Sequence, residues 1–139
     1  MCQLNYPFTA YSWVLVSDVI AIKNVDKSVF DSKETGIPKE ISYFFELDDM
    51  QASEKRFVQL AWNKVAYEGY FYKDPSTSHR LKLRWKNDLE EQLHLYFINV
   101  VQDIIQGNKI PIYYQPLIEF IKIDSTHYEI ILRYTGHKI

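Results

Sequence analysis

Residues 80–86 alternate without exception between cationic and apolar side chains, and this period of two predicts a β-strand. The apolar face supplies a core and holds Leu81, Leu83 and Trp85. The opposite face holds Arg80, Lys82, Arg84 and Lys86. Cations are rarely buried without partners, so we expect this face to lie in solvent or against an anion. The pattern therefore favours folds in which one face of a sheet is covered and the other is open.

Two interpretations fit the cationic face. Successive cations lie roughly 6.6 Å apart along a strand, a spacing close to that of phosphates along one nucleic-acid strand. The first interpretation is therefore a strand that binds a polyanion. The second is an ordinary antiparallel strand whose outer face is charged and solvated. The pattern alone does not choose between them.

The composition is typical of a soluble globular protein rather than a disordered chain, with 47% apolar and 24% charged residues. A length of 139 residues predicts a single domain, residues 1–139. The one cysteine excludes a disulfide framework and a thiolate-rich metal site. No stretch approaches the ~20 apolar residues of a membrane helix, and the first residues lack the features of a secretory signal. We expect a cytoplasmic protein with no membrane partner.

The net charge of −2 argues against a generic nucleic-acid binder, but the charge is unevenly distributed. Residues 73–86 contain five cations and one anion, a net charge of +4, which leaves −6 on the rest of the chain. A basic stripe on an acidic body is compatible with a docking face for nucleic acid or for an acidic protein.

Strands are predicted where β-branched and aromatic residues alternate between turn signals. They cover residues 11–16, a three-stranded antiparallel meander over 55–85, and a closing hairpin of 117–123 and 128–134. The first turn of the meander falls at Asn63 and Lys64, because Asn readily takes the positive φ of a two-residue hairpin turn.

Two helices are predicted. A short one has Pro38 early in its first turn. A long one begins with Asn87 as its N-cap, has Glu90 as the second member of a capping box, and ends at Gly107. The elements together predict an α+β fold: a mainly antiparallel, strongly curved sheet or half-open barrel with one short and one long helix.

Residues 23–36 are rich in turn formers and charges, which predicts a long loop. Long loops in compact domains are frequently binding loops. Val29 and Phe30 in its middle predict that the loop is anchored to the core. Its lysines, with the one that follows it, are expected to approach a DNA groove and make any base contacts. They are Lys23, Lys27, Lys33 and Lys39.

Motifs for catalysis do not occur in the sequence. It has no glycine-rich nucleotide-binding loop and no nucleophile elbow, and its four histidines lie at least ten residues apart. We predict no catalytic residue, no metal site and no cofactor. One enzymatic alternative is a small metal-dependent nuclease in which Asp31 and Lys33 act together with Asp18 or Asp26.

The eleven tyrosines support an alternative of another class. Tyrosine can stack on a nucleobase, but it can equally anchor a protein–protein interface. A protein–protein interaction module would use tyrosines outside the core. The candidates are Tyr67, Tyr70, Tyr72, Tyr113 and Tyr114.

Three segments resemble a known family of recognition modules. They are residues 26–30, residues 35–41 with Phe44 and Phe45, and residues 80–85 followed by Asp88 and Leu89. Their order and spacing, over about residues 12–134, resemble the DNA-recognition modules of bacterial restriction systems. Some of these modules have the DNA-binding pseudobarrel fold shared with plant transcription-factor domains. The resemblance implies a pseudobarrel that binds DNA beside a nuclease or helicase subunit encoded nearby.

The sequence therefore predicts a non-catalytic module that binds DNA, with duplex DNA favoured. It would be the accessory or specificity component of a bacterial restriction or phage-defence system. Backbone phosphates would be held by Arg80, Lys82, Arg84 and Lys86. Any hydrolytic activity would be that of a DNA endonuclease component.

Overall fold

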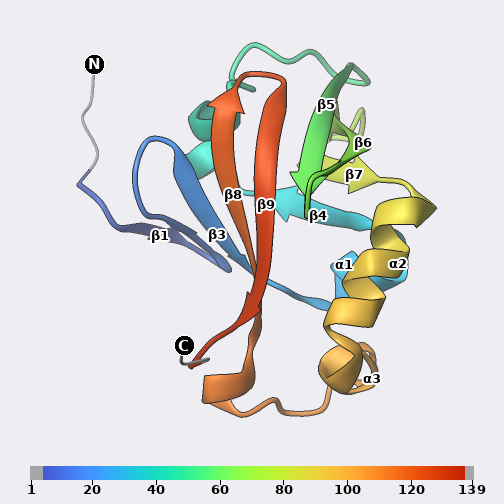
Figure 1. The fold of residues 1–139 in the computed structure, drawn as a ribbon. Helices are drawn as coiled ribbons and strands as arrows, with labels where there is room; N and C mark the ends of the chain where they lie inside the picture. The colour runs from blue at the N-terminus through green and yellow to red at the C-terminus, as the bar shows by residue number, and fades with distance from the viewer. Residues whose placement is uncertain (1–4, 137–139) are drawn as a thin grey trace.

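The computed structural model describes residues 5–136, whose strands form one strongly curled sheet (Figure 1). In chain order the strands are β1 (Phe8–Ala10), β2 (Trp13–Leu15), β3 (Ile20–Asn24), β4 (Glu34–Ile37), β5 (Lys55–Trp62), β6 (Val65–Lys73), β7 (Leu81–Trp85), β8 (Pro116–Asp124) and β9 (His127–Tyr134). The α-helices are α1 (Lys27–Ser32), α2 (Asn87–Tyr96) and α3 (Ile98–Gln106). Two 3-10 helices, η1 (Lys39–Phe45) and η2 (Ile112–Tyr114), complete the described elements.

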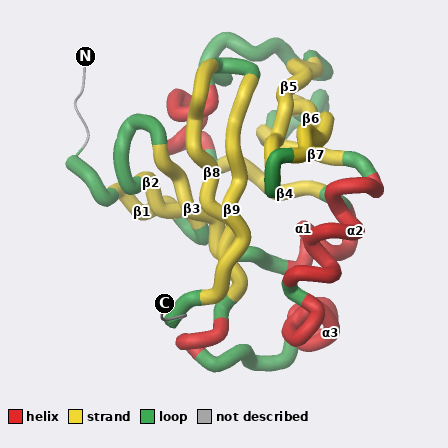
Figure 2. Tube along the Cα trace, viewed as in Figure 1, coloured by secondary structure: helices red, strands yellow, loops and turns green. Residues whose placement is uncertain are grey.

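The strand order in the sheet is β1-β2-β3-β8-β9-β5-β6-β7-β4. Neighbouring strands are antiparallel, except that β5 and β9 run parallel. The strands form a curled layer, and the three α-helices lie at one side of it (Figure 2). The predicted class, α+β with a mainly antiparallel, strongly curved half-barrel, is confirmed.

A hydrogen bond from an indole joins strands near the two ends of the sheet. The indole Nε1 of Trp13, on β2, donates to the carbonyl oxygen of Gly36, on β4, over 3.0 Å. Since β1 and β4 are the first and last strands of the sheet order, this contact can form only because the sheet curls back on itself. The indole ring is completely buried, so the bond lies at the edge of the core.

The 3-10 helix η1 fills the interior of the half-barrel with aromatic side chains. The ring of Phe45 lies 5.5 Å from Trp13, 5.3 Å from Phe71 and 5.6 Å from Tyr128, measured between ring centroids. These partners come from β2, β6 and β9, so one side chain contacts distant parts of the sheet. A segment without long regular structure therefore supplies the centre of the core.

The predicted long helix is two helices, because the chain bends at Phe97 between α2 and α3. Phe97 has φ −98° and ψ 25°, and its side chain is fully buried beside Phe30 of α1 and Tyr134 of β9. Both helices bury apolar residues, Leu89 and Leu93 in α2 and Val100 and Val101 in α3. The C-terminal stop is confirmed, since Gly107 has the left-handed φ of 76°.

The start of this helix differs from the predicted one. Lys86 occupies the N-cap position, and Asn87 is the first helical residue. The Asn87 side chain instead accepts a hydrogen bond from Lys33, and Glu90 accepts one from the indole of Trp85. The predicted capping box is therefore wrong, because tertiary partners engage both side chains.

The predicted loop over residues 23–36 is also wrong. This segment contains the end of β3, the short helix α1 and the strand β4. Val29 and Phe30 are buried as expected, and their burial fixes α1 against the core. The short helix that was predicted to begin near Pro38 is the 3-10 helix η1, with Pro38 at its N-cap position.

Other local predictions are confirmed. In β7, Leu83 and Trp85 are buried, whereas Lys82 and Arg84 are not. Asn63 and Lys64 both have positive φ, 52° and 67°, at the turn between β5 and β6. The closing hairpin is formed by β8 and β9. Within residues 5–136, no helix has the length and apolar character needed to cross a membrane.

We predict that Trp13→Phe lowers the free energy of unfolding by about 1–3 kcal/mol, because it keeps an aromatic ring but leaves a partly buried carbonyl without its donor. Urea denaturation followed by circular dichroism measures the change. Trp62→Phe is the matched control, since Trp62 is only half-buried at the end of β5. Equal losses in the two variants would contradict a special role for the Trp13 bond.

Candidate nucleic-acid interface

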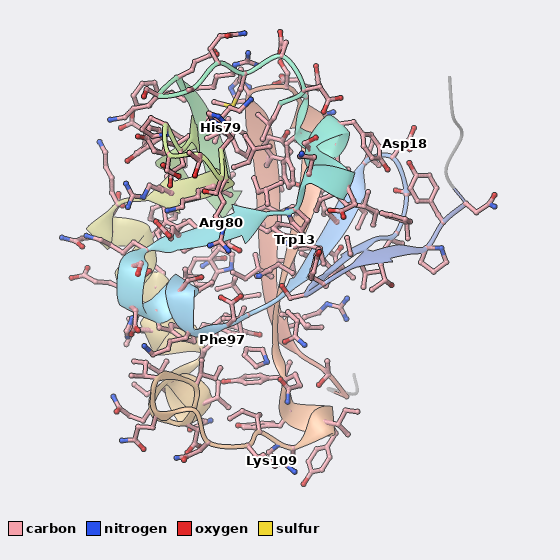
Figure 3. The ribbon with its side chains drawn as sticks, turned by 180° about the vertical axis from the view of Figure 1, so that it is seen from behind. Trp13, Asp18, His79, Arg80, Phe97 and Lys109 are labelled. Atoms are coloured by element: carbon pink, nitrogen blue, oxygen red, sulfur yellow. The ribbon has the colours of Figure 1, made fainter. Side chains whose placement is uncertain are left out.

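The pairing of β4 with β7 brings two distant segments of the chain side by side. Glu34 lies opposite Arg84, and Gly36 lies opposite Lys82. Because partners across a ladder point to the same face, the outward side chains of both strands share one surface. In Figure 3, the labels of Arg80 and Trp13 both lie near the cyan arrow of β4.

Six of the eight lysines and arginines predicted to contact DNA border this strand pair. Four belong to β7 or its ends, and two flank β4. They are Arg80, Lys82, Arg84, Lys86, Lys33 and Lys39. We call this set the β4–β7 cationic surface. The sequence suggested the residues from two separate segments, and the register of the sheet unites them.

Carboxylates on β4 and β6 form ion pairs with three of these cations. Glu34 Oε1 accepts from Arg84 Nε over 2.8 Å, and Glu34 Oε2 lies 3.5 Å from Lys82 Nζ. Lys86 pairs with Glu68 of β6. The Tyr70 hydroxyl and the Glu34 carboxylate raise the pKa of the Arg84 guanidinium. These contacts fix the direction of the cations and neutralise part of their charge.

Lys23 and Lys27 lie away from the β4–β7 cationic surface. Lys23 is only 2% exposed, and its Nζ donates to Asp26 Oδ2 over 2.9 Å and to Ser12 Oγ over 2.5 Å. It belongs to the interior, and the alternation of β3 was the signal, since Lys23 shares the inward face of Ala21. Lys27 is exposed on α1 and pairs with Asp31 over 2.7 Å.

Gly36 leaves an open position beside Lys82. A Cβ atom built on Gly36 would meet no atom within 4 Å, and Gly36 does not have a positive φ. Neither backbone conformation nor packing therefore requires glycine here. Gly69, on β6, is the opposite case, because an added Cβ would come within 2.8 Å of the Arg84 carbonyl oxygen. A glycine without a structural reason in a strand can mark the close approach of a ligand.

One aromatic residue next to the cationic surface, Phe57, was not among the candidate residues named from the sequence. Phe57 of β5 is 58% exposed, and its ring centroid lies 5.7 Å from that of Tyr70 on β6. Lys55 places its Nζ 5.0 Å from the Tyr70 ring centroid. The signal was the alternation in β5, where Phe57 stands between Arg56 and the buried Val58.

The five candidate tyrosines occupy different environments. Tyr67 is buried, so it belongs to the core. Tyr114 stacks on Tyr134 with ring centroids 4.5 Å apart, whereas Tyr113 is exposed. Tyr70 and Tyr72 are half-buried on the outer face of β6. The tyrosines therefore do not form one interface.

The residues suggested for a metal-dependent nuclease do not share a centre. Asp31 pairs with Lys27, Asp26 pairs with Lys23, and Lys33 donates to Asn87 over 2.8 Å. Within the described part of the chain, no group of three or more His, Cys, Asp or Glu side chains is placed to hold a metal ion.

Comparisons with known proteins identify a similar fold. No family model matches the chain, and no curated protein matches it in sequence. Among solved structures, the chain is similar to the N-terminal domain of Helicobacter pylori LlaJI.R1, with a TM-score of 0.50 and 15% identity. The match covers 81% of this chain and 79% of that domain. At this identity the similarity concerns the fold.

We predict that Lys23→Met lowers the free energy of unfolding by about 1–3 kcal/mol, because Asp26 and Ser12 lose their shared donor. Although burial raises the pKa of Asp26, the hydrogen bond and charge of Lys23 outweigh it, and the net shift is downward. This stabilisation is present above the ordinary Asp pKa of 3.8 and is lost as the pH falls through the lowered value. Denaturation at several pH values should therefore give a flatter acid profile for the variant than for the wild type.

We also predict that Gly36→Thr leaves the free energy of unfolding unchanged within about 0.5 kcal/mol, since the added atoms enter open space on a strand. Gly69→Ala should cost about 1–3 kcal/mol, because its methyl group overlaps the Arg84 carbonyl. Thermal denaturation compares the two. A similar loss in both would show that the position beside Lys82 is not open.

Proposed function

We propose that this chain is a DNA-binding module without catalysis of its own, and that it serves as the accessory or specificity component of a bacterial restriction-type defence system. Duplex DNA is the favoured ligand. The observation that carries the proposal is the β4–β7 pairing, which sets Lys82 and Arg84 of one segment opposite Gly36 and Glu34 of another, with four further cations at the ends of these strands.

The geometry of this surface suits a phosphate backbone. Lys82 and Arg84 are two residues apart on one strand, so their side chains emerge roughly 6.6 Å apart on the same face. Arg80 comes just before β7 and Lys39 comes two residues after β4, and both are exposed. Gly36, opposite Lys82, has open space where a Cβ atom would stand, so a DNA backbone can approach the sheet closely there. Such contacts position a protein on DNA without reading its sequence.

The fold similarity supports the defence role. LlaJI.R1 is a restriction-type defence protein, and the similar part is its N-terminal domain. By analogy, this chain would supply recognition to a nuclease or helicase subunit encoded nearby. The analogy is one of fold, so it supports the class of system more than any particular DNA sequence.

Glu34 allows a test in which two kinds of substitution should change DNA affinity in opposite directions. Its carboxylate, whose side chain is only 14% exposed, binds Arg84 and Lys82 and would repel an incoming phosphate. Removing this negative charge should help a polyanion bind. Removing nearby positive charges that have no ion-pair partner among residues 5–136 should have the reverse effect, and Arg80 and Lys39 meet that condition.

We predict that Glu34→Gln strengthens duplex binding, whereas Arg80→Gln with Lys39→Gln weakens it for every sequence. The slope of log K against log salt should become shallower by about 0.9 for each phosphate contact that is lost. Fluorescence anisotropy of a labelled duplex, titrated across a range of KCl concentrations, measures both quantities.

The matched control is Lys64→Gln with Lys109→Gln, which removes the same charge from exposed positions elsewhere; Figure 3 shows Lys109 at the far end of the molecule from Arg80. This control should leave the salt slope unchanged. Equal effects of the two double variants would mean that binding depends on net charge alone. The proposal fails if the wild-type protein binds neither duplex nor single-stranded DNA, modified or unmodified, in a salt-dependent way.

A further inference from the structure

The outer face of β5, β6 and β7 combines aromatic rings with cations in two rows that run across the strands. In one row Phe57 lies opposite Tyr70, which lies opposite Arg84. The next row contains Lys55, Tyr72 and Lys82 in the same order. We call this set the outer aromatic face; its residues are Lys55, Phe57, Tyr70, Tyr72, Lys82 and Arg84.

The rings of this face are available for a ligand. Phe57 is 58% exposed, although the large apolar side chain of phenylalanine is normally buried in a core. Its plane is tilted by 52° from that of Tyr70, with centroids 5.7 Å apart, so neither ring covers the other in a parallel stack. Phe57 and Tyr70 stabilise the sheet as cross-strand neighbours, but this role does not require that the Phe57 ring be exposed to solvent.

Cations lie on both sides of the rings. Lys55 Nζ lies 5.0 Å from the Tyr70 centroid on one side. On the other side Arg84 follows Tyr70 across the ladder, and Lys82 follows Tyr72. An occupant of this face must therefore offer flat apolar surfaces flanked by negative charge. Nucleotides combine both features in every unit.

A hollow beside Phe57 gives room for the edges of such bases. Its volume is about 380 Å³, and its polar lining includes Gln59, Glu68 and His127. Amide, carboxylate and imidazole groups can pair with the donors and acceptors of a base edge. The hollow lies beside the ring that is most exposed on this face, so a base on Phe57 would place its edge there.

We propose that the outer aromatic face binds a short stretch of unpaired nucleotides, with bases stacked on Phe57 and Tyr70 and phosphates held by Lys55 and Arg84. Within a duplex the faces of the bases are stacked on each other, so an open ring on a sheet can stack only on an unpaired base. The inference rests on the proposed function and deepens it. The β4–β7 cationic surface and the outer aromatic face meet at Lys82 and Arg84. A DNA that occupies both would have duplex on the first and unpaired nucleotides on the second, so the preferred DNA contains a junction between duplex and single strand.

The test compares three labelled probes by fluorescence anisotropy: a thymidine oligonucleotide, a blunt duplex, and the same duplex with a thymidine overhang. The wild-type protein should bind the overhang probe more tightly than the blunt duplex. Phe57→Ala should weaken binding of the single strand and the overhang probe by about five- to 150-fold, the range that loss of one base–aromatic stack produces. Binding of the blunt duplex should change less than twofold.

Two further variants separate aromatic stacking from general apolar contact. Phe57→Tyr keeps the ring and should bind as the wild type does, whereas Phe57→Leu keeps apolar area without a π-face and should lose most of the affinity for unpaired bases. Ile131→Ala is the control at an exposed apolar residue of β9, and it should change nothing. Full affinity in Phe57→Leu would show that apolar contact suffices and would overturn base stacking.

The failure of this inference can be told apart from that of the proposed function. If Phe57→Ala changes no probe while Arg80→Gln with Lys39→Gln weakens duplex binding, the outer aromatic face is not a nucleotide site and the proposed function stands. If Phe57→Ala weakens the blunt duplex as much as the overhang probe, stacking on unpaired bases is also excluded. If no probe binds the wild type, both proposals fall.

Discussion

The hydrogen bond from the Trp13 indole to the Gly36 carbonyl oxygen unites strands that the sheet order places almost at opposite ends. A sheet that curls this far encloses a space, and that space must be filled at the density of a protein interior. Phe45 fills it from a 3-10 helix, where its ring meets Trp13 and rings of other strands. Closure and filling therefore depend on each other, and Trp13 takes part in both.

The same bond explains how β4 can serve as the last strand of the sheet. It is four residues long and pairs on one side with β7, so its outer edge would otherwise offer unpaired backbone groups to another chain. The indole of Trp13 donates a hydrogen bond to one of these groups, the carbonyl oxygen of Gly36. Because β4 is held between Trp13 and β7, Glu34 keeps a fixed position opposite Arg84, and the cations around it take defined directions. The candidate surface is thus a product of how the sheet closes.

Sequence patterns predicted those elements that are long enough to contain several repeats of the apolar–polar pattern. The strand predicted at residues 80–86, which is β7 (Leu81–Trp85), the meander and the closing hairpin were predicted because alternation and turn residues are local signals. α1 and β4 were not, because six and four residues contain too little periodicity, and pairing with β7 specifies β4. The sequence around the bend at Phe97 contains no proline or glycine that would indicate a bend. The Phe97 ring packs against Phe30 and Tyr134, which are distant in the sequence.

The sequence also left open how the candidate site residues would be arranged. Alternation and charge together identified the cations of β7, but charge did not distinguish the interior Lys23 from the exposed Lys39, since burial depends on the element to which each belongs. Phe57 was missed because exposure of an aromatic residue depends on which neighbours cover the face. Those neighbours come from β6 and β7, and the register that aligns them is set by the whole sheet.

The pairing of β3 with β8 has a consequence for how the chain reaches its folded state. Ile20 lies opposite Ile121, so about a hundred residues must be enclosed in a loop before this ladder can form. Contacts of such long sequence separation slow folding, because the entropy of closing the loop is lost before the contacts are gained. On a ribosome, the first three strands would emerge well before their partner does. During that interval the edge of β3 is open to other chains, which makes synthesis the stage at which this protein is most exposed to mispairing.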